Sequence, residues 1–143
     1  MSDTPYVLDA SALLCLFFQE PGAERVEAVL DTATMSTINY AEVIAKLADR
    51  GVPVQIMMAD LSDLDLEIVP ADRVLADMAG RIGAGPHRSG LAIGDRFCLA
   101  LAKRLGATAL TVDRGWVKVA EQIGVSVEVL RQDAPAVALA VSS

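Results

Sequence analysis

The sequence predicts an α/β protein: a three-layer α/β/α sandwich with a mostly parallel central sheet. Short apolar runs of strand type alternate with longer stretches of helical periodicity along the 143 residues. Strands separated by helices are joined by crossovers, which make the strands parallel. The hydrophobic content of 53% supplies a core for both faces of such a sheet. A chain of this length forms one domain.

The expected strands are five short apolar segments, each bounded by a turn or a helix signal. The first ends at Asp9, and the fourth runs directly into Asp113. The third alternates apolar and charged residues until Pro70 breaks it. In chain order, the strands cover residues 6–8, 35–37, 66–70, 109–112 and 125–130.

The expected helices fill the segments between the strands. Residues that stop helices mark several of their ends, among them Gly51, Gly106 and Gly124, whereas Pro53 suits a first helical turn. In chain order, the helices cover residues 11–18, 23–30, 39–49, 53–64, 72–82, 95–105 and 116–123.

Two segments do not fit a helix or a strand. Residues 83–94 contain four glycines and a proline, which predicts a mobile loop. Residues 132–143 are small and apolar without clear helix caps. We therefore expect a single domain over residues 1–131 and a C-terminal tail over 132–143.

Charge is distributed unevenly along the chain. The formal net charge is −7, which by itself disfavours an anionic partner. However, residues 1–72 carry three basic side chains against thirteen acids, whereas residues 73–118 carry eight basic side chains against three acids. Two of those three acids are Asp95 and Asp113. The second half thus surrounds isolated carboxylates with positive charge, although Arg73 and Lys103 are expected to be ordinary solvated residues.

The cellular location follows from what the sequence does not contain. The first five residues lack the basic and apolar regions of a signal peptide. No apolar run is long enough for a membrane helix. Cys15 and Cys98 lie within apolar helical runs, without a Cys or His at ligand spacing, so we expect buried thiols. These features predict a cytoplasmic protein without membrane association.

Four acids occupy positions that favour chemistry. Asp9 and Asp113 each follow an apolar strand, at the carboxyl end where parallel sheets place functional side chains. Asp95 stands at the head of a helix, and Glu42 lies early in another, beside its apolar stripe. Taken singly, Glu42 could be an exposed helix residue, Asp95 a helix N-terminal charge and Asp113 a turn former.

Taken together, the four acids suggest a metal site. Clustered carboxylates repel one another unless a cation neutralises them. Mg²⁺, or Mn²⁺, prefers oxygen ligands and usually keeps several waters, one of which can attack a phosphodiester. Other nucleophile arrangements have little support, because the only histidine, His87, lies in the 83–94 loop. The chain also has no P-loop and no dinucleotide glycine fingerprint.

The sequence resembles the PIN-domain ribonucleases of the VapC toxin type over about residues 6–130. Four segments in the order and spacing of that family carry the resemblance: Tyr6-Val7-Leu8-Asp9-Ala10-Ser11-Ala12-Leu13, Ser36-Thr37-Ile38-Asn39-Tyr40-Ala41-Glu42-Val43, Leu91-Ala92-Ile93-Gly94-Asp95-Arg96-Phe97-Cys98-Leu99-Ala100 and Ala109-Leu110-Thr111-Val112-Asp113-Arg114-Gly115-Trp116. Arg96 departs from members that carry an aliphatic residue after the third acid.

The resemblance implies that Asp9, Glu42, Asp95 and Asp113 form an acidic metal site. It further implies small hydroxyl residues in support, here Ser11 and Thr111. Members are typically homodimers and the toxin halves of toxin–antitoxin pairs, each inhibited by a small antitoxin. We therefore expect a magnesium- or manganese-dependent endoribonuclease that cleaves RNA phosphodiester bonds.

Three alternatives remain at this point. A haloacid-dehalogenase-like phosphatase needs a second acid two residues after Asp9, where this chain has Ser11. A phospho-receiver domain needs a Lys after a late strand, but Asp113 is followed by Arg114-Gly115-Trp116. A non-catalytic binding module with the PIN fold would not need the complete set of acids.

Two binding surfaces are also expected, one for the substrate and one for a second copy of the chain. Four basic residues in segments flanking Asp95 and Asp113 are candidates for binding substrate phosphates: Arg88, Arg96, Arg114 and Lys118. The excess of aliphatic residues predicts a homodimer that buries apolar helix surface. Its candidate contacts are Leu14, Phe17, Phe18 and the run Ile56-Met57-Met58.

Overall fold

The computed structural model describes residues 4–83 and 90–130. Its centre is a five-stranded sheet in the order β3-β2-β1-β4-β5. Every neighbouring pair in this sheet is parallel, which confirms the predicted fold class. The strands are β1 (Tyr6–Leu8), β2 (Ala33–Ser36), β3 (Glu67–Val69), β4 (Thr108–Thr111) and β5 (Ser126–Val129).

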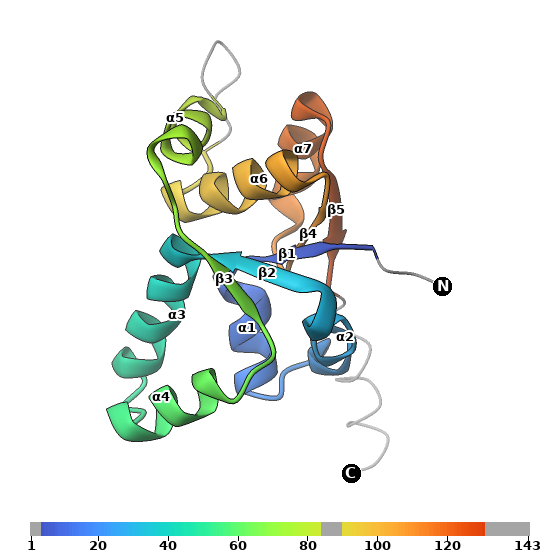
Figure 1. Cartoon of the computed structure of the whole chain (residues 1–143). Coiled ribbons are helices and arrows are strands. Elements are labelled where there is room, and N and C mark those ends of the chain that lie inside the picture. The colour runs from blue at the N-terminus through green and yellow to red at the C-terminus, as the bar shows by residue number, and fades with distance from the viewer. Residues whose placement is uncertain (1–3, 84–89, 131–143) are drawn as a thin grey trace.

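Helices cover both faces of this sheet, as Figure 1 shows. One layer contains α1 (Ala10–Phe17), α2 (Ala23–Val29), α3 (Thr37–Asp49) and α4 (Val54–Ser62), and the other contains α5 (Arg73–Arg81), α6 (Ile93–Leu105) and α7 (Val117–Ile123). Two short 3₁₀ turns, η1 (Leu30–Thr32) and η2 (Arg114–Trp116), precede β2 and α7. Every predicted helix and strand is present, with its ends at most two residues from those expected.

Two boundaries differ from the prediction for reasons that affect the functional site. The strand expected to reach position 37 ends at Ser36, because the Ser36 hydroxyl caps α3 by accepting the Asn39 N–H. The helix expected to start at Asp95 starts at Ile93, which makes Asp95 its third residue. From there its carboxylate accepts the Ala92 N–H.

Alternation along the two central strands creates a separate core on each face. Val7 and Ala109 point into a cluster with α5, α6 and α7. Leu8 and Leu110 point into a second cluster with α1 to α4. Cys98 and Cys15 are buried free thiols in the first and second cluster, respectively. The central pair β1–β4 is thus fixed from both sides.

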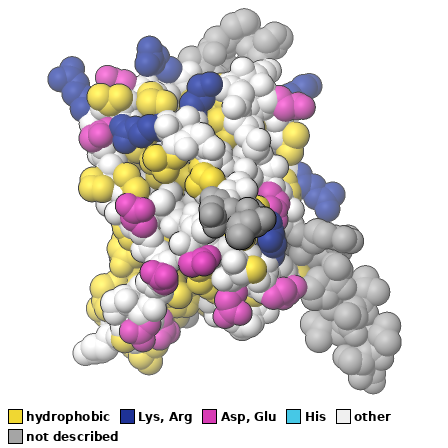
Figure 2. All heavy atoms as spheres, turned by 45° about the vertical axis from the view of Figure 1, so that its right-hand side comes forward, with side chains coloured by type: hydrophobic (Ala, Val, Ile, Leu, Met, Phe, Trp, Pro, Cys, Tyr) yellow, Lys and Arg dark blue, Asp and Glu magenta, His cyan; other side chains and the backbone are white. Residues whose placement is uncertain are grey.

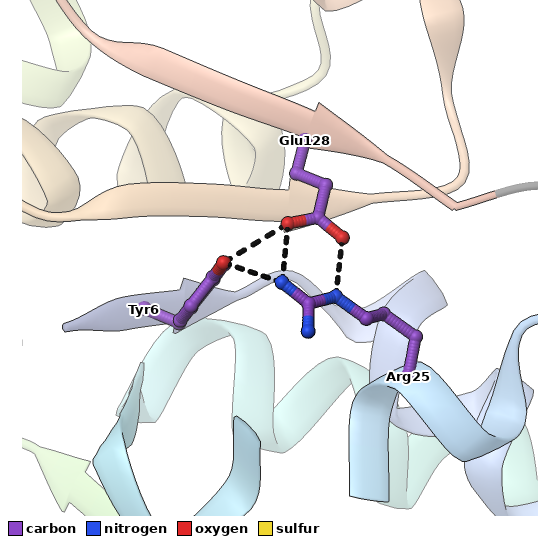
Figure 3. Close-up of polar contacts among 3 residues, drawn as sticks. All are labelled: Tyr6, Arg25 and Glu128. Carbon is purple, nitrogen blue, oxygen red and sulfur yellow. Dashed lines mark hydrogen bonds and ion pairs between the residues drawn. The ribbon is translucent and has the colours of Figure 1, made fainter. Parts of the chain in front are cut away.

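The edge strand β5 is tied to the rest of the sheet by a polar cluster, which we call the Tyr6–Arg25–Glu128 clamp (Figure 3). Arg25 on α2 forms a two-pronged ion pair with Glu128, with N···O distances of 2.7 and 3.0 Å. The Tyr6 hydroxyl accepts from Arg25 at 2.7 Å and donates to Glu128 at 3.0 Å. The clamp joins α2, β1 and β5 near the protein surface.

The structure corrects part of the expected dimer surface. Met57 is only 1% exposed and packs in the core beneath α4, so it cannot present a contact to a second copy. Ile56 and Met58 on the same helix are exposed. Leu14, Phe17 and Phe18 are half-buried against the same core. None of the helices in the described part of the chain is long and apolar enough to cross a membrane.

Candidate active site

The candidate site lies at the carboxyl ends of β1 and β4. The strand order runs one way from β1 to β2 and β3, and the other way from β1 to β4 and β5. The crevice at such a reversal is where open α/β sheets bind ligands. Asp9 directly follows β1, and Asp113 lies two residues beyond the end of β4. The topology therefore brings these two predicted acids to the same place.

Asp9 is the most buried acid of the site, with 4% of its surface exposed. It is also the N-cap of α1, where its carboxylate accepts the Ala12 N–H at 2.9 Å. The Ser11 hydroxyl lies 2.7 and 2.9 Å from its two oxygens, and the Thr111 hydroxyl donates to it at 2.7 Å. Local donors thus partly compensate a buried carboxylate that forms no ion pair among the described residues.

These donors do not fully offset the cost of burial. Burial raises the pKa of Asp9 to about 6, and the charge of Asp95 adds to the rise, while hydrogen bonds from Thr111, Ser11 and Ala12 act against it. A raised pKa means that the ionised form is destabilised relative to water. A nearby cation would therefore bind more favourably here than at an exposed aspartate.

Glu42 is held on α3 by its neighbour Asn39, which is buried. The side-chain Nδ2 of Asn39 donates both to the Glu42 carboxylate at 2.9 Å and to the Gly94 carbonyl of α6 at 3.0 Å. The Ser36 hydroxyl donates in turn to the side-chain oxygen Oδ1 of Asn39 at 2.8 Å. A Cβ on Gly94 would collide with the Glu42 carboxylate. Glycine at position 94 therefore allows α6 to approach Glu42 closely.

Asp95 lies between the other acids in the first turn of α6. Burial raises its pKa, and the charges of Asp113 and Glu42 raise it further, while the Ala92 N–H and the Trp116 indole act in the opposite direction. The Trp116 side chain is fully buried, and its N–H lies near enough to Asp95 to act on the charge of that carboxylate, but it forms no hydrogen bond of regular geometry within residues 4–83 and 90–130. This leaves an unsatisfied donor close to Asp95.

Asp113 is exposed and caps the short turn η2, accepting the Gly115 N–H at 2.8 Å. Its own N–H donates to the Thr111 hydroxyl at 3.1 Å. The buried thiol of Cys98 lies close to three of these acids. Burial raises its pKa, and the charges of Asp9, Asp95 and Glu42 raise it further. The four acids thus form one electrostatic neighbourhood.

The donor set suits a hard divalent cation, since it offers carboxylate oxygens, and burial destabilises the ionised forms of two of its members, Asp9 and Asp95. Within the described residues, no three Asp, Glu, His or Cys side chains stand close enough to hold one ion together. Mg²⁺ commonly binds through one or two carboxylates and several waters. The arrangement therefore fits an ion held largely through water, and such a water would also supply an acceptor for the Trp116 N–H.

The basic residues predicted to flank the site occupy different environments. Arg96 is half-buried, and its Nε donates to the Leu91 carbonyl at 3.1 Å. Arg114 and Lys118 are exposed on η2 and α7, and none of these three side chains forms an ion pair in the part of the chain that the structure covers. Arg88 lies outside the described residues, as do His87 and the rest of residues 84–89 in the predicted 83–94 loop.

Figure 2 shows the charge distribution on one face of the molecule. Most of the Lys and Arg side chains in this view lie in the upper half, where Figure 1 places α5, α6 and α7. Asp and Glu side chains gather in the lower half. Lys103 is exposed, as predicted, and its ammonium donates to the Ile123 carbonyl at the end of α7.

Sequence reasoning missed three residues that shape this site: Asn39, Gly94 and Trp116. The pattern Ser36-x-x-Asn39, directly before an apolar helix, is a capping signal that could have identified Asn39 as buried and polar. Gly94 opens the helix that carries Asp95, a position where glycine has no advantage unless another group comes close. No local signal indicates that the Trp116 indole turns toward Asp95.

Comparisons with known proteins agree with this geometry. The family model for the PIN domain matches residues 6–122. The chain is 39% identical over 113 residues to Ribonuclease VapC from Mycolicibacterium smegmatis, which covers 73% of this chain and 88% of that protein. It is 35% identical over 113 residues to Ribonuclease VapC30 from Mycobacterium tuberculosis, covering 73% of this chain and 86% of the relative.

Solved structures share the fold at lower sequence identity. VapBC2 from Rickettsia felis, bound to a DNA fragment from its promoter, superposes with a TM-score of 0.67 at 16% identity and covers 88% of this chain and 98% of that chain. DNA-bound VapBC from Salmonella typhimurium gives a TM-score of 0.66 at 20% identity, with 87% and 97% coverage.

Proposed function

The chain belongs to the PIN domain family, and on this premise we propose that it is a magnesium- or manganese-dependent endoribonuclease, the toxin of a toxin–antitoxin pair. The observation that carries the proposal is the environment of Asp9. This carboxylate is buried at the carboxyl end of the central strand, and it is held by hydroxyl and amide donors beside three other acids. The names of the relatives as ribonucleases support the activity.

In this proposal each acid has a distinct setting. Asp9 is oriented by Ser11 and Thr111, and Glu42 is oriented by Asn39. Asp95 is oriented by the Ala92 N–H. Asp113 is exposed, and we propose that it lies on the side where the substrate binds and that its side chain moves most freely of the four. Asp9, Glu42, Asp95 and Asp113 would together hold the divalent ion, directly or through water.

The bound ion would supply positive charge that activates a water and stabilises the charge developing on the phosphodiester. The chain's own residues hold the geometry. Ser11 and Thr111 keep the Asp9 carboxylate in one orientation, which limits the reorganisation needed when substrate binds. Arg96, Arg114 and Lys118, with Arg88 from the 83–94 loop, are proposed to contact phosphates beside the scissile bond.

The proposal extends to partners and setting. The substrate is RNA, and a small antitoxin inhibits the protein, in keeping with the toxin–antitoxin proteins among the similar structures. We propose a homodimer that uses exposed helix residues such as Ile56 and Met58, a nuclease domain over residues 1–131 and a tail over 132–143. A cytoplasmic location suits an RNA substrate and two free thiols.

The phosphatase and receiver alternatives have less support from the geometry. Position 11, where the phosphatase needs an acid, carries a serine whose hydroxyl donates to Asp9. Neither alternative uses Glu42 and Asn39. The remaining alternative, a non-catalytic module with the same fold, is separated from the nuclease only by experiment.

The test is a metal titration with two readouts. RNA should be cleaved with Mg²⁺ or Mn²⁺ and not in EDTA, and either ion should raise the melting temperature by binding the native state. The quadruple variant Asp9→Asn/Glu42→Gln/Asp95→Asn/Asp113→Asn should lose both effects. Equal thermal shifts in both proteins would place the ion elsewhere on the acidic surface. Binding of the ion at the site without any cleavage would favour the non-catalytic module.

A further inference from the structure

An open pocket of about 400 Å³ lies between α1 and α3, next to the acidic site. Its lining includes Ser11 and Val112. Ser11 donates to Asp9 and accepts the Val112 N–H at 3.2 Å, and Val112 stands between Thr111 and Asp113 in sequence. The pocket therefore adjoins the acidic site at Ser11, the residue that donates to Asp9.

One side of α3 runs from the acidic site to the pocket. Glu42, Lys46 and Arg50 follow one another at four-residue spacing, so they lie along the same side of the helix. Glu42 belongs to the acidic site, and Lys46 and Arg50 line the pocket. With a rise of 1.5 Å per residue, the two cations lie about 6 and about 12 Å along the helix from Glu42.

These cations are unusual in their part of the chain. They are two of only three basic residues before position 73, and the third, Arg25, is ion-paired in the Tyr6–Arg25–Glu128 clamp. Both are exposed, and neither forms an ion pair among the residues that the structure describes. The acids Glu20 and Asp49 also line the pocket but do not pair with them. Both cations thus remain open to an anionic ligand.

The pocket also offers a flat surface. The Arg50 guanidinium lies over the Phe18 ring at 4.5 Å from its centroid. Unstacked RNA bases bind by stacking on aromatic rings and on guanidinium planes. The Arg50–Phe18 contact holds the guanidinium in place, so that a base can stack on its outer face while its positive charge remains available to a phosphate.

We propose that this pocket binds the single-stranded RNA that leaves the acidic site. Lys46 and Arg50 contact successive phosphates, and the Phe18–Arg50 pair stacks one base. The inference rests on the proposed ribonuclease function and adds to it a second contact surface, on α3, separate from the basic residues of the second half. RNA is the ligand that fits phosphate-binding cations, a stacking surface and a position next to the proposed phosphodiester-cleaving site.

The test measures binding of a fluorescein-labelled single-stranded RNA of about 16 nucleotides and random sequence. Fluorescence anisotropy is recorded in EDTA, so that no RNA is cleaved, between about 50 and 200 mM KCl. The variant Lys46→Ala/Arg50→Ala should bind about tenfold more weakly. The slope of log K against log salt should fall by about 1.4, the expected value for two lost contacts to a single strand.

Matched controls come from equivalent residues outside the pocket. Arg73→Ala/Arg81→Ala removes two exposed cations of α5 and should leave affinity and slope unchanged. Phe18→Leu should weaken binding about tenfold through the loss of one stack, whereas Phe17→Leu, next to it but outside the pocket lining, should not. Melting temperatures of the variants show that the changes in binding do not come from unfolding.

The outcomes separate this inference from the proposed function. A wild type that cleaves RNA with Mg²⁺ or Mn²⁺, and a pocket variant with wild-type affinity and salt slope, would overturn the pocket alone. Equal losses in the pocket and α5 variants, or no measurable binding by the wild type at low salt, would also overturn it. Absence of metal-dependent cleavage by the wild type contradicts the ribonuclease function itself.

Discussion

Thr111 donates a hydrogen bond of 2.7 Å to Asp9, 102 positions earlier in the chain. The bond follows from the register of the sheet, in which Leu8 of β1 pairs with Leu110 of β4. The residue after Leu8 is Asp9 and the residue after Leu110 is Thr111, so these two residues lie beside each other. The central strand pair therefore sets the orientation of the most buried acid, and the stability of the sheet is coupled to the geometry of the site.

This coupling predicts the effect of Thr111→Val. The substitution preserves shape and removes the hydroxyl that donates to Asp9, so the free energy of unfolding should fall by about 1.5–3 kcal/mol in metal-free buffer. In an Asp9→Asn background the same change should cost clearly less, with a coupling of at least about 0.5 kcal/mol. Urea unfolding of the four proteins measures the cycle. Additive losses would mean that the hydroxyl matters for packing or for the Asp113 N–H alone.

The raised pKa of Asp9 predicts how stability depends on pH without metal. The folded-state pKa of about 6 lies above the ordinary value of 3.8. The folded state thus holds this proton more tightly, and its contribution to stability is complete below about pH 4 and is lost as pH rises through 6. The loss amounts to about 3 kcal/mol, at about 1.4 kcal/mol per pKa unit.

The measurement is urea unfolding from about pH 4 to 7 in EDTA for the wild type and Asp9→Asn. Because Asp95 and other groups also titrate, the difference between the two proteins isolates Asp9. This difference should grow in favour of Asp9→Asn as pH rises through 6. Parallel stability curves would show that Asp9 has an ordinary pKa.

Glycine at position 94 gives a third prediction. Gly94→Ala places a methyl group against the Glu42 carboxylate, so it should displace Glu42 or α6 and weaken Mn²⁺ binding by about 10- to 100-fold, as for lost outer-shell support. Gly80→Ala is the matched control, since a Cβ there meets no atom within 4 Å. It should raise helix stability by up to about 1 kcal/mol and leave Mn²⁺ binding unchanged. Isothermal titration calorimetry with Mn²⁺ compares the two, and equal affinities would contradict the close approach.

The sequence allowed the layers, the parallel sheet and every helix and strand to be predicted, because apolar periodicity and glycine or proline punctuation agree along this chain. The positions of Asp9 and Asp113 followed from the rule that functional groups lie at the carboxyl ends of parallel strands. The three hydrogen bonds to Asp9 depend on strand register and on a helix cap, which a periodicity argument cannot supply.

The remaining features of the site depend on contacts between distant segments. The Asn39 bridge from Glu42 to Gly94 joins α3 to α6, 55 positions along the chain. The Met57 error arose because a run of three apolar residues does not show which one faces the core, and only the packing of α4 determines this. Likewise, the pocket beside Ser11 depends on how α1 and α3 pack.

The most direct test of the account is RNA cleavage by Asp9→Asn, compared with Asp31→Asn, in saturating Mg²⁺ or Mn²⁺. Asp31 is exposed on η1, just before β2 begins, and therefore lies at the amino ends of the parallel strands, opposite the carboxyl ends that carry the candidate site. Asp9→Asn should fold and yet cleave more than about 100-fold more slowly than the wild type, exceeding the usual cost of losing outer-shell support. Asp31→Asn should cleave at the wild-type rate. Wild-type cleavage by folded Asp9→Asn would contradict the assignment of this site as the catalytic centre.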